Sequence, residues 1–142
     1  MRVTGVCNMR VLLIEDEPTT AKAIELMLST EGFNCYTTDL GEEGLDLGKL
    51  YDYDIILLDL NLPDMSGTDI LARIKAEGSP LRRAPVVVLT TTDDKVEIQR
   101  CYDLGCNVYI TKPVNYESFA QAIRQLGLFL SVIQVPDLGD GG

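Results

Sequence analysis

The chain has 142 residues, close to the size of one ordinary domain, and its 46% hydrophobic content excludes wholesale disorder. The 12 Lys and Arg against 22 Asp and Glu give a net charge of −10, so we do not expect this chain to bind nucleic acid directly. The sequence has no histidine, which excludes a Ser-His-Asp triad and a His-ligated zinc site.

The two ends of the chain differ from the rest. Residues 1–8 carry no apolar stretch of the signal-peptide kind, and the triplet MRV at residue 9 repeats the one at residue 1, so we interpret 1–8 as a leader or an added extension. The Gly-rich end, 136–142, is predicted to be a flexible tail, which leaves 9–135 as the domain. No run of residues reaches the ~18 apolar positions that a membrane span needs. Four cysteines without CxxC spacing favour reduced thiols in a cytoplasmic protein.

Short apolar runs alternate with longer stretches of helical periodicity. The apolar runs predict strands at 11–14, 33–37, 55–58, 86–89 and 107–111. The helical stretches predict helices at 18–31, at 42–50, from 67 through 74, at 96–104, and from 115 past 130. Continuous apolar runs are typical of strands that are covered on both faces. The repeated strand–helix order therefore predicts an α/β fold with a doubly wound, five-stranded parallel sheet and helices on both of its faces.

Polar residues stand where the predicted strands end. Glu15 and Asp16 follow the first strand, Asp59 follows the third, Thr90 ends the fourth and Lys112 ends the fifth. In a parallel sheet these strand ends meet at one edge, which is where such folds bind ligands. Three carboxylates repel one another unless cations join them, and Lys112 together with a divalent ion would balance their charge.

Carboxylate oxygens are the ligands that Mg²⁺ or Mn²⁺ prefers. An aspartate can attack phosphorus to give an aspartyl phosphate, and a metal can clamp the group in transfer. The hydroxyl of Thr90 and the ammonium of Lys112 could bind the remaining oxygens of the phosphoryl group. The strand-end residues thus point to phosphoryl transfer.

Taken together, these residues resemble the receiver domains of two-component response regulators. The resemblance covers about residues 9–128. It rests on matches in order along the chain: Glu15-Asp16, Asp59, Pro63 and Gly67 within DLNLPDMSG, Thr90, and Lys112-Pro113. It implies the flavodoxin-like strand order 2-1-3-4-5.

The resemblance also implies a role for each matching residue. Asp59 would be the phosphoacceptor and Asp16 a direct Mg²⁺ ligand, with Glu15 acting through metal-bound water. Asn61 occupies the position whose backbone carbonyl binds the metal, and Lys112 would pair with the phosphoryl oxygens. The phosphoryl donor would be the phosphohistidine of a sensor histidine kinase, so the chain is expected to be a signalling protein that assists its own phosphorylation rather than an enzyme in the usual sense.

The family's conformational switch maps onto two further residues. Thr90 would move toward the phosphoryl group and Tyr109 would turn inward behind it, which remodels the face formed by the fourth helix, fifth strand and fifth helix. The peptide bond before Pro113 is expected to be cis.

The kind of receiver is less sharply defined. Residues 9–71 resemble the receiver of a DNA-binding cell-cycle regulator, whereas residues 80–135 are more similar to stand-alone receivers that serve phytochrome-type histidine kinases. A natural single-domain receiver, a receiver isolated from a larger DNA-binding regulator and a chimaera all remain open.

Three other readings compete with a phosphorylated receiver. A phosphatase of the haloacid dehalogenase type needs a second acid two residues after its nucleophile, where this chain has Asn61. A flavodoxin-like redox carrier needs a phosphate-cradling loop after the first strand, where this chain has the acidic run 15–17. A receiver-like docking module that is never phosphorylated usually lacks one of the acids or the lysine, and here all are present.

The last predicted helix is apolar on most of its sides. Phe119, Ile123, Leu126 and Leu130 form one stripe, and further apolar residues follow it: Leu128, Phe129, Val132 and Val135. A sheet can cover only one side of a helix. We therefore expect the second set to form an isologous homodimer interface.

Overall fold

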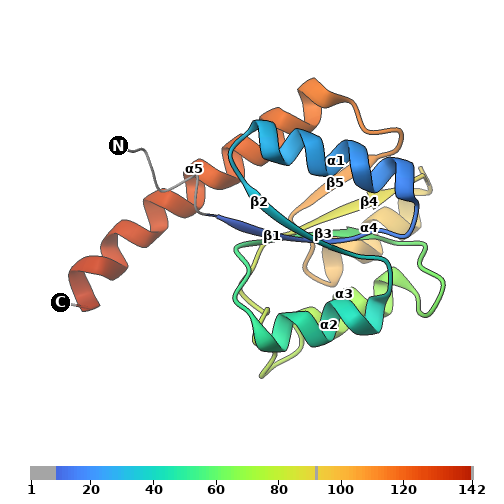
Figure 1. Cartoon of the computed structure of the whole chain (residues 1–142). Helices are drawn as coiled ribbons and strands as arrows, with labels where there is room; N and C mark the ends of the chain where they lie inside the picture. Colours follow the sequence, from blue (N-terminus) through green and yellow to red (C-terminus); the bar gives the residue numbers. More distant parts are fainter. Residues whose placement is uncertain (1–8, 92, 142) are drawn as a thin grey trace.

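The computed structural model describes the backbone of residues 9–91 and 93–141 and side chains as far as residue 130, except that of residue 129. Strands and helices alternate strictly along the chain (Figure 1). The strands are β1 (Arg10–Ile14), β2 (Asn34–Thr38), β3 (Ile55–Asp59), β4 (Val86–Thr90) and β5 (Val108–Thr111). The helices are α1 (Pro18–Thr30), α2 (Gly41–Leu50), α3 (Gly67–Lys75), α4 (Lys95–Asp103) and α5 (Tyr116–Gly141).

The strands form one parallel sheet in the order β2-β1-β3-β4-β5, which confirms the predicted fold class. Every residue of β3 and β4, two of the three inner strands, is buried, as expected of continuous apolar runs that are covered on both faces. The edge strands β2 and β5 are more exposed, and their weaker apolar character in the sequence reflects this position.

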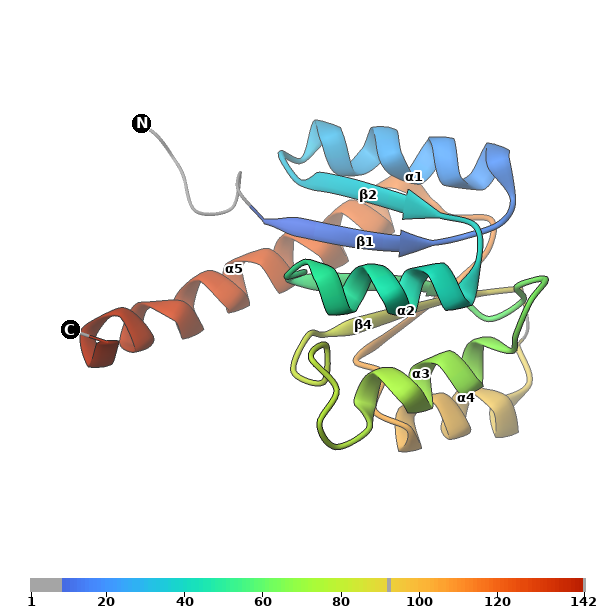
Figure 2. The ribbon, with the colours of Figure 1, turned by 60° about the horizontal axis from the view of Figure 1, so that its bottom comes forward.

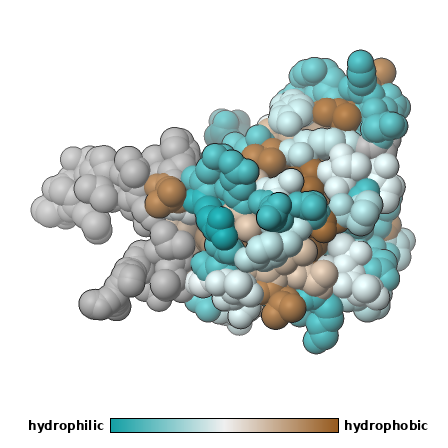
Figure 3. Space-filling model, turned by 90° about the horizontal axis from the view of Figure 1, so that it is seen from above, coloured by the Kyte–Doolittle hydropathy of each residue, from teal (hydrophilic) through white to brown (hydrophobic). Residues whose placement is uncertain are grey.

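Helices cover both faces of the sheet. Figures 1 and 2 show α1 and α5 on one face and α2, α3 and α4 on the other. Residues alternate along each strand between the two cores: Leu13 and Leu57 pack with Phe119 of α5, while Leu12 and Leu58 pack with Ile70 of α3. Seen from above, the surface is mostly hydrophilic, with hydrophobic residues in separate patches (Figure 3).

Local signals explain where several helices begin. Glu17 caps α1 by accepting a hydrogen bond from the Thr20 N–H at 2.7 Å, and a proline occupies the first turn. Ser66 and Asp94 cap α3 and α4 in the same way. These caps place the helix N-termini beside the carboxyl ends of the strands, where the candidate site lies.

The predicted boundaries differ from the observed ones mainly at the C-terminal end of the described residues. The inner strands and helices agree to within about one residue. Helix α5, however, runs to Gly141 and extends beyond the rest of the domain (Figure 1), so the backbone of 136–141 is helical where the Gly-rich composition predicted a flexible tail. Residues 1–8, interpreted above as a leader, lie outside the described residues.

Candidate functional site

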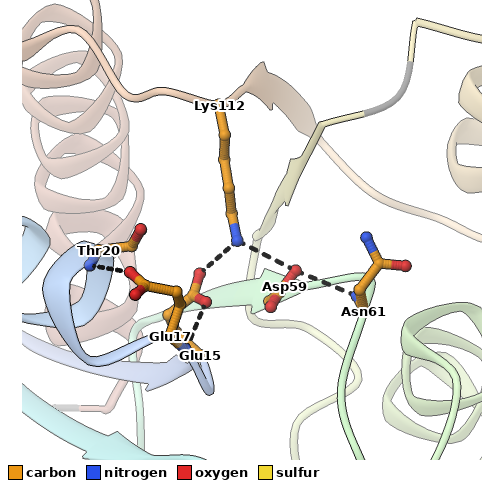
Figure 4. Close-up of polar contacts among 6 residues, drawn as sticks. All are labelled: Glu15, Glu17, Thr20, Asp59, Asn61 and Lys112. Atoms are coloured by element: carbon orange, nitrogen blue, oxygen red, sulfur yellow. Dashed lines mark hydrogen bonds and ion pairs between the residues drawn. The ribbon is translucent and has the colours of Figure 1, made fainter.

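The carboxyl ends of β1, β3 and β5 bring together the charged residues that the sequence singled out. Glu15 and Asp16 follow β1. Asp59 is the last residue of β3 and Lys112 follows β5, and Figure 4 shows both with Glu15. The carboxylates of Glu15, Asp16 and Asp59 each offer an oxygen within 4.8 Å of the others. The expectation that ligands bind at the carboxyl ends of parallel strands therefore identified residues that form one cluster.

Lys112 lies between two of these carboxylates. Its Nζ is 2.8 Å from Oε1 of Glu15 and 3.3 Å from Oδ1 of Asp59. Burial alone would lower the pKa of Lys112, but its contacts with Glu15 and Asp59 outweigh this and the pKa of Lys112 is raised. The ammonium therefore stays charged and can bind an incoming anionic group at this point.

Asp59 is almost completely buried, with 1% of its surface exposed. Its Oδ1 accepts a hydrogen bond from the Asn61 N–H at 3.0 Å in addition to the contact with Lys112. Burial raises the pKa of Asp59, and the charge of Glu15 adds to this, against the opposing effects of Asn61 and Lys112. The carboxylate is thus held in a fixed orientation in an environment that lacks full charge compensation.

Glu15 is also buried, whereas Asp16 is exposed at the mouth of the site. The second carboxylate oxygen of Glu15 accepts a hydrogen bond from the Glu17 N–H at 3.1 Å. Partial burial and the neighbouring Asp59 carboxyl raise the pKa of Asp16. Two acids with raised pKa values and a third nearby form a donor set of oxygens that fits a hard divalent cation.

The two predicted switch residues, Thr90 and Tyr109, lie on β4 and β5, the strands that follow β3 in the order of the sheet. Thr90 is buried at the end of β4, and its carbonyl accepts a hydrogen bond from the Lys112 N–H at 2.7 Å. Tyr109 on β5 is half-buried and packs against the core on the side of α2, α3 and α4. The Lys112–Pro113 peptide bond is cis, the geometry that the resemblance implies.

A hollow of about 630 Å³ opens beside the carboxylates. It is lined by Asp16, the loop 60–66, Thr68, and Glu97 of α4. The exposed Asn61 contributes to this lining, so a ligand that reaches Asp59 through the hollow would pass both Asp16 and Asn61.

Sequence reasoning missed two residues that accept hydrogen bonds at helix N-termini. Glu17 appeared only as part of an acidic loop, although it caps α1. Asp64 was not singled out, although its carboxylate accepts hydrogen bonds from the backbone of α2. An acid directly before a proline at the start of a helical pattern is a readable N-cap signal for Glu17 in hindsight, but nothing local in the sequence connects Asp64 to α2.

The predicted dimer residues lie away from this site, on α5 (Figure 1). Leu128 is 61% exposed, in keeping with a surface position. The side chains of Phe129, Val132 and Val135 lie outside the described residues.

Sequence comparisons agree with the resemblance drawn from the motifs. The family model of the response regulator receiver domain matches residues 11–124. The cell cycle transcriptional regulator CtrA of Caulobacter vibrioides is 47% identical over 135 residues, which cover 92% of this chain and 57% of CtrA. The cell cycle response regulator CtrA of Brucella ovis is 49% identical over 138 residues, with the same coverage of both chains. The chain thus spans little more than half the length of these curated relatives, and the matched residues include both halves of the domain.

Solved structures give the same result. A response regulator receiver domain from Rhodospirillum rubrum is 50% identical, with a TM-score of 0.70 over 87% of this chain and 94% of that one. The receiver domain of a sensor histidine kinase from Pseudomonas aeruginosa, solved with a magnesium ion coordinated in its active site cleft, is 27% identical with a TM-score of 0.76 over 84% of this chain and 98% of that one. Among the described residues of the present chain, no helix is both long and apolar enough to span a bilayer.

Proposed function

Because this chain belongs to the response regulator receiver domain family, we propose that Asp59 accepts a phosphoryl group from the phosphohistidine of a sensor histidine kinase, with Mg²⁺ or Mn²⁺ bound at the carboxylate cluster. The observation that carries the proposal is the placement of Lys112, whose ammonium lies within 3.3 Å of Asp59 and 2.8 Å of Glu15. A carboxylate nucleophile, a cation and an acidic metal site then share one strand edge.

The proposed transfer forms one bond to phosphorus and breaks another. A carboxylate oxygen of Asp59 attacks phosphorus as the bond from phosphorus to the donor's imidazole nitrogen breaks, and that nitrogen keeps the electron pair. The hydrogen bond from Asn61 and the contact with Lys112 hold the nucleophile in place. When bound, Mg²⁺ neutralises charge on the phosphoryl oxygens. Asp16 would bind the ion directly, Glu15 through water and Asn61 through its carbonyl.

Phosphorylation of Asp59 would then change the conformation of Thr90 and Tyr109. Thr90 is buried at the end of the strand next to Asp59, within the same edge of the sheet. A phosphoryl group on Asp59 would draw the Thr90 hydroxyl toward it, and Tyr109 would move into the space behind Thr90. These shifts would change the surface formed by α4, β5 and α5 for a partner.

Intact mass after incubation with acetyl phosphate tests the proposal. The parent chain and Asp59→Asn are each measured with Mg²⁺ and with a chelator. A single base-labile phosphoryl adduct that requires both Mg²⁺ and Asp59 is the expected result. An adduct of unchanged yield in Asp59→Asn would exclude Asp59 as the acceptor, and no adduct under any condition would favour a docking module.

The comparisons favour a receiver from a DNA-binding cell-cycle regulator over one that serves a phytochrome-type kinase. Identity of 47–49% to CtrA extends over 92% of the chain. We therefore propose that the domain works in the cytoplasm as the phosphorylated input of a regulator of this type. A phosphotransfer assay with purified kinases separates the two options, because a phytochrome-type donor that transfers fastest would contradict the CtrA assignment.

We also propose that α5 pairs with a second copy of the chain. Leu128 of α5 is 61% exposed, and the C-terminal part of α5 extends beyond the rest of the domain (Figure 1). An apolar stripe that continues along a helix beyond its own sheet needs another surface to cover it. A symmetric dimer would bring the same stripe from a second protomer against it.

A further inference from the structure

Helix α2 is capped by a residue far away in the sequence. Its own N-cap residue is Leu40, which has no polar side chain to accept a hydrogen bond from the first turn. Instead, Asp64 in the β3–α3 loop accepts the N–H of Gly41 at 2.8 Å on one carboxylate oxygen and the N–H of Glu42 at 3.0 Å on the other. The loop between Asp59 and α3 is therefore attached to the start of α2.

The same stretch of chain also holds the loop after β1. We call residues 38–42 the α2 bracket. The carbonyl of Thr38 in the bracket accepts the N–H of Glu15 at 3.0 Å. The hydroxyl of Thr38 accepts the N–H of Leu40 at 3.3 Å and donates to the Glu43 carboxylate, which keeps the bracket folded onto α2. The loop after β1 and the β3–α3 loop are thus both hydrogen-bonded to the α2 bracket.

Packing leaves the bracket little freedom to move away from the β3–α3 loop. A Cβ atom at Gly41 would lie 2.7 Å from a side-chain carbon of Met65 and 2.4 Å from one of Ile70. Met65 follows Asp64 directly, so the contact and the two hydrogen bonds act at the same place. The glycine allows the backbone of α2 to approach the loop this closely.

We propose that Asp64 is a positioning residue for the metal and phosphoacceptor site, where it fixes the β3–α3 loop to the α2 bracket. Asp64 lies outside the carboxylate cluster formed by Glu15, Asp16 and Asp59. It acts through the loop, which carries Asn61, the residue whose N–H orients the Asp59 carboxylate at 3.0 Å. Because the bracket also holds the Glu15 backbone, Asp64 links the β1 side of the site to the β3 side.

The chemistry suits this role. A carboxylate that accepts two consecutive backbone N–H groups at a helix N-terminus forms charge-assisted hydrogen bonds and interacts favourably with the helix dipole. The N–H groups of Glu42 and Gly41 lower the pKa of Asp64, so the carboxylate stays ionised and the cap is retained at neutral pH.

Amide hydrogen exchange of the metal-free protein tests the positioning role without any bound ion. In Asp64→Ala, exchange at the amides of Gly41 and Glu42 is expected to rise roughly fivefold, and exchange at the Asn61 and Glu15 amides should rise with it. Asp64→Asn keeps one acceptor oxygen and should restore part of the protection. Leu45→Val is the matched control, because it weakens α2 from its buried side and leaves the cap in place.

Calorimetric titration with Mg²⁺ then tests the consequence for the site, and this part rests on the proposed function. Asp64→Ala should weaken Mg²⁺ binding roughly tenfold, with Asp64→Asn in between and Leu45→Val close to the parent chain. Unchanged exchange at Asn61 in Asp64→Ala would overturn the positioning role, as would an equal loss of affinity in Leu45→Val. A parent chain that binds no Mg²⁺ would refute the proposed function, and exchange at Asn61 and Glu15 would still decide the role of Asp64.

Discussion

Lys112 and Glu15 form a buried ion pair although two strands separate β1 from β5 in the sheet. The Lys112 ammonium reaches over the ends of β3 and β4 to lie 2.8 Å from the Glu15 carboxylate, which is fully buried (Figure 4). The same ammonium lies 3.3 Å from Asp59. One lysine therefore compensates two buried acids, and its loss should affect stability as well as phosphoryl transfer.

Lys112→Met should destabilise the metal-free domain by about 3 kcal/mol, because removal of one partner leaves buried carboxylates without compensation. Urea unfolding followed by circular dichroism in the presence of a chelator measures this loss. Lys49→Met, on the exposed side of α2, is the control and should change stability little. Equal stability of Lys112→Met and the parent chain would show that the ion pair contributes nothing.

Mg²⁺ should stabilise the folded chain, because the proposed ion would bind the native carboxylate cluster and not the unfolded chain. At a free concentration about 100 times the Kd, linkage predicts a gain of about 2.7 kcal/mol, which thermal unfolding detects as a raised Tm. Asp16→Asn removes the proposed direct ligand and should abolish most of this gain at the same concentration. A gain of the same size in Asp16→Asn would exclude Asp16 from the metal site.

Without Mg²⁺, the effect of Asp16→Asn on stability should have the opposite sign. The pKa of Asp16 is raised in the folded state above its ordinary value of 3.8, so folding favours the protonated acid. Its contribution to stability is then present at low pH and is lost as the pH rises through the folded pKa. In a chelator at neutral pH, Asp16→Asn is expected to be at least as stable as the parent chain, and a clear loss of Tm would contradict the repulsion between Asp16 and Asp59.

Gly67 should tolerate no side chain, because its backbone lies against Leu60, the residue next to Asp59 in the chain. A Cβ there would lie 2.3 Å from the Leu60 Cα and 2.8 Å from the Asp59 carbonyl oxygen, both of which are backbone atoms. Gly67→Ala should cost about 3 kcal/mol in urea unfolding. Gly78→Ala is the comparison: its φ of +87° is strained for alanine but no atom lies within 4 Å, so about 1 kcal/mol is expected. Equal costs at the two positions would argue against the close approach at Gly67.

The strands and the central acids could be predicted from the sequence because their signals are local or depend only on the topology of the sheet. The run at 55–58 is apolar throughout because β3 is buried on both faces, and Asp59 and Lys112 each stand at the carboxyl end of a predicted strand. Asp64 could not be found in this way. Its partners in α2 lie 22 and 23 residues earlier, and an aspartate in a loop that contains proline and serine is typical of ordinary turn chemistry.

The predicted end of α5 differs from the described helix for a related reason. Glycines and Pro136 in the last residues are normally signals that a helix stops. The helix nevertheless continues to Gly141. The contacts that hold its first half could not be foreseen either, since Arg124 pairs with a residue 93 positions earlier in the chain.

The ion pair between Arg124 and Glu31 predicts that the stability of the domain depends on pH. Arg124 binds Glu31 at the end of α1 through both carboxylate oxygens, at 2.5 and 2.8 Å, and Tyr116 donates to the same carboxylate at 2.9 Å. The Arg124 guanidinium holds the pKa of Glu31 below its ordinary value of 4.5. The pair therefore adds stability above the unfolded pKa and loses it as the pH falls through the folded pKa.

Glu31→Gln should lower Tm at neutral pH by a small amount, as is typical of ion pairs near the surface, and the difference from the parent chain should disappear as the pH falls below 4.5. Thermal unfolding from neutral to strongly acidic pH measures this convergence. Glu117→Gln, an exposed acid on α5, is the control. A difference that stays constant across this range would mean that the carboxylate charge of Glu31 is not what stabilises the α1–α5 contact.

The proposed dimer makes the last prediction. Light scattering at tens of micromolar should give about twice the 15.6 kDa mass of one chain. Leu128 is 61% exposed and would be buried once in each protomer of a symmetric pair, so Leu128→Lys acts twice and should weaken association by roughly 100-fold or more. Leu26→Lys changes a similarly exposed leucine on α1 and should leave the dimer intact, which separates a contact through α5 from a general effect of surface charge. A parent chain that is monomeric with residues 131–142 present, or a dimer that both variants weaken alike, would refute the pairing through α5.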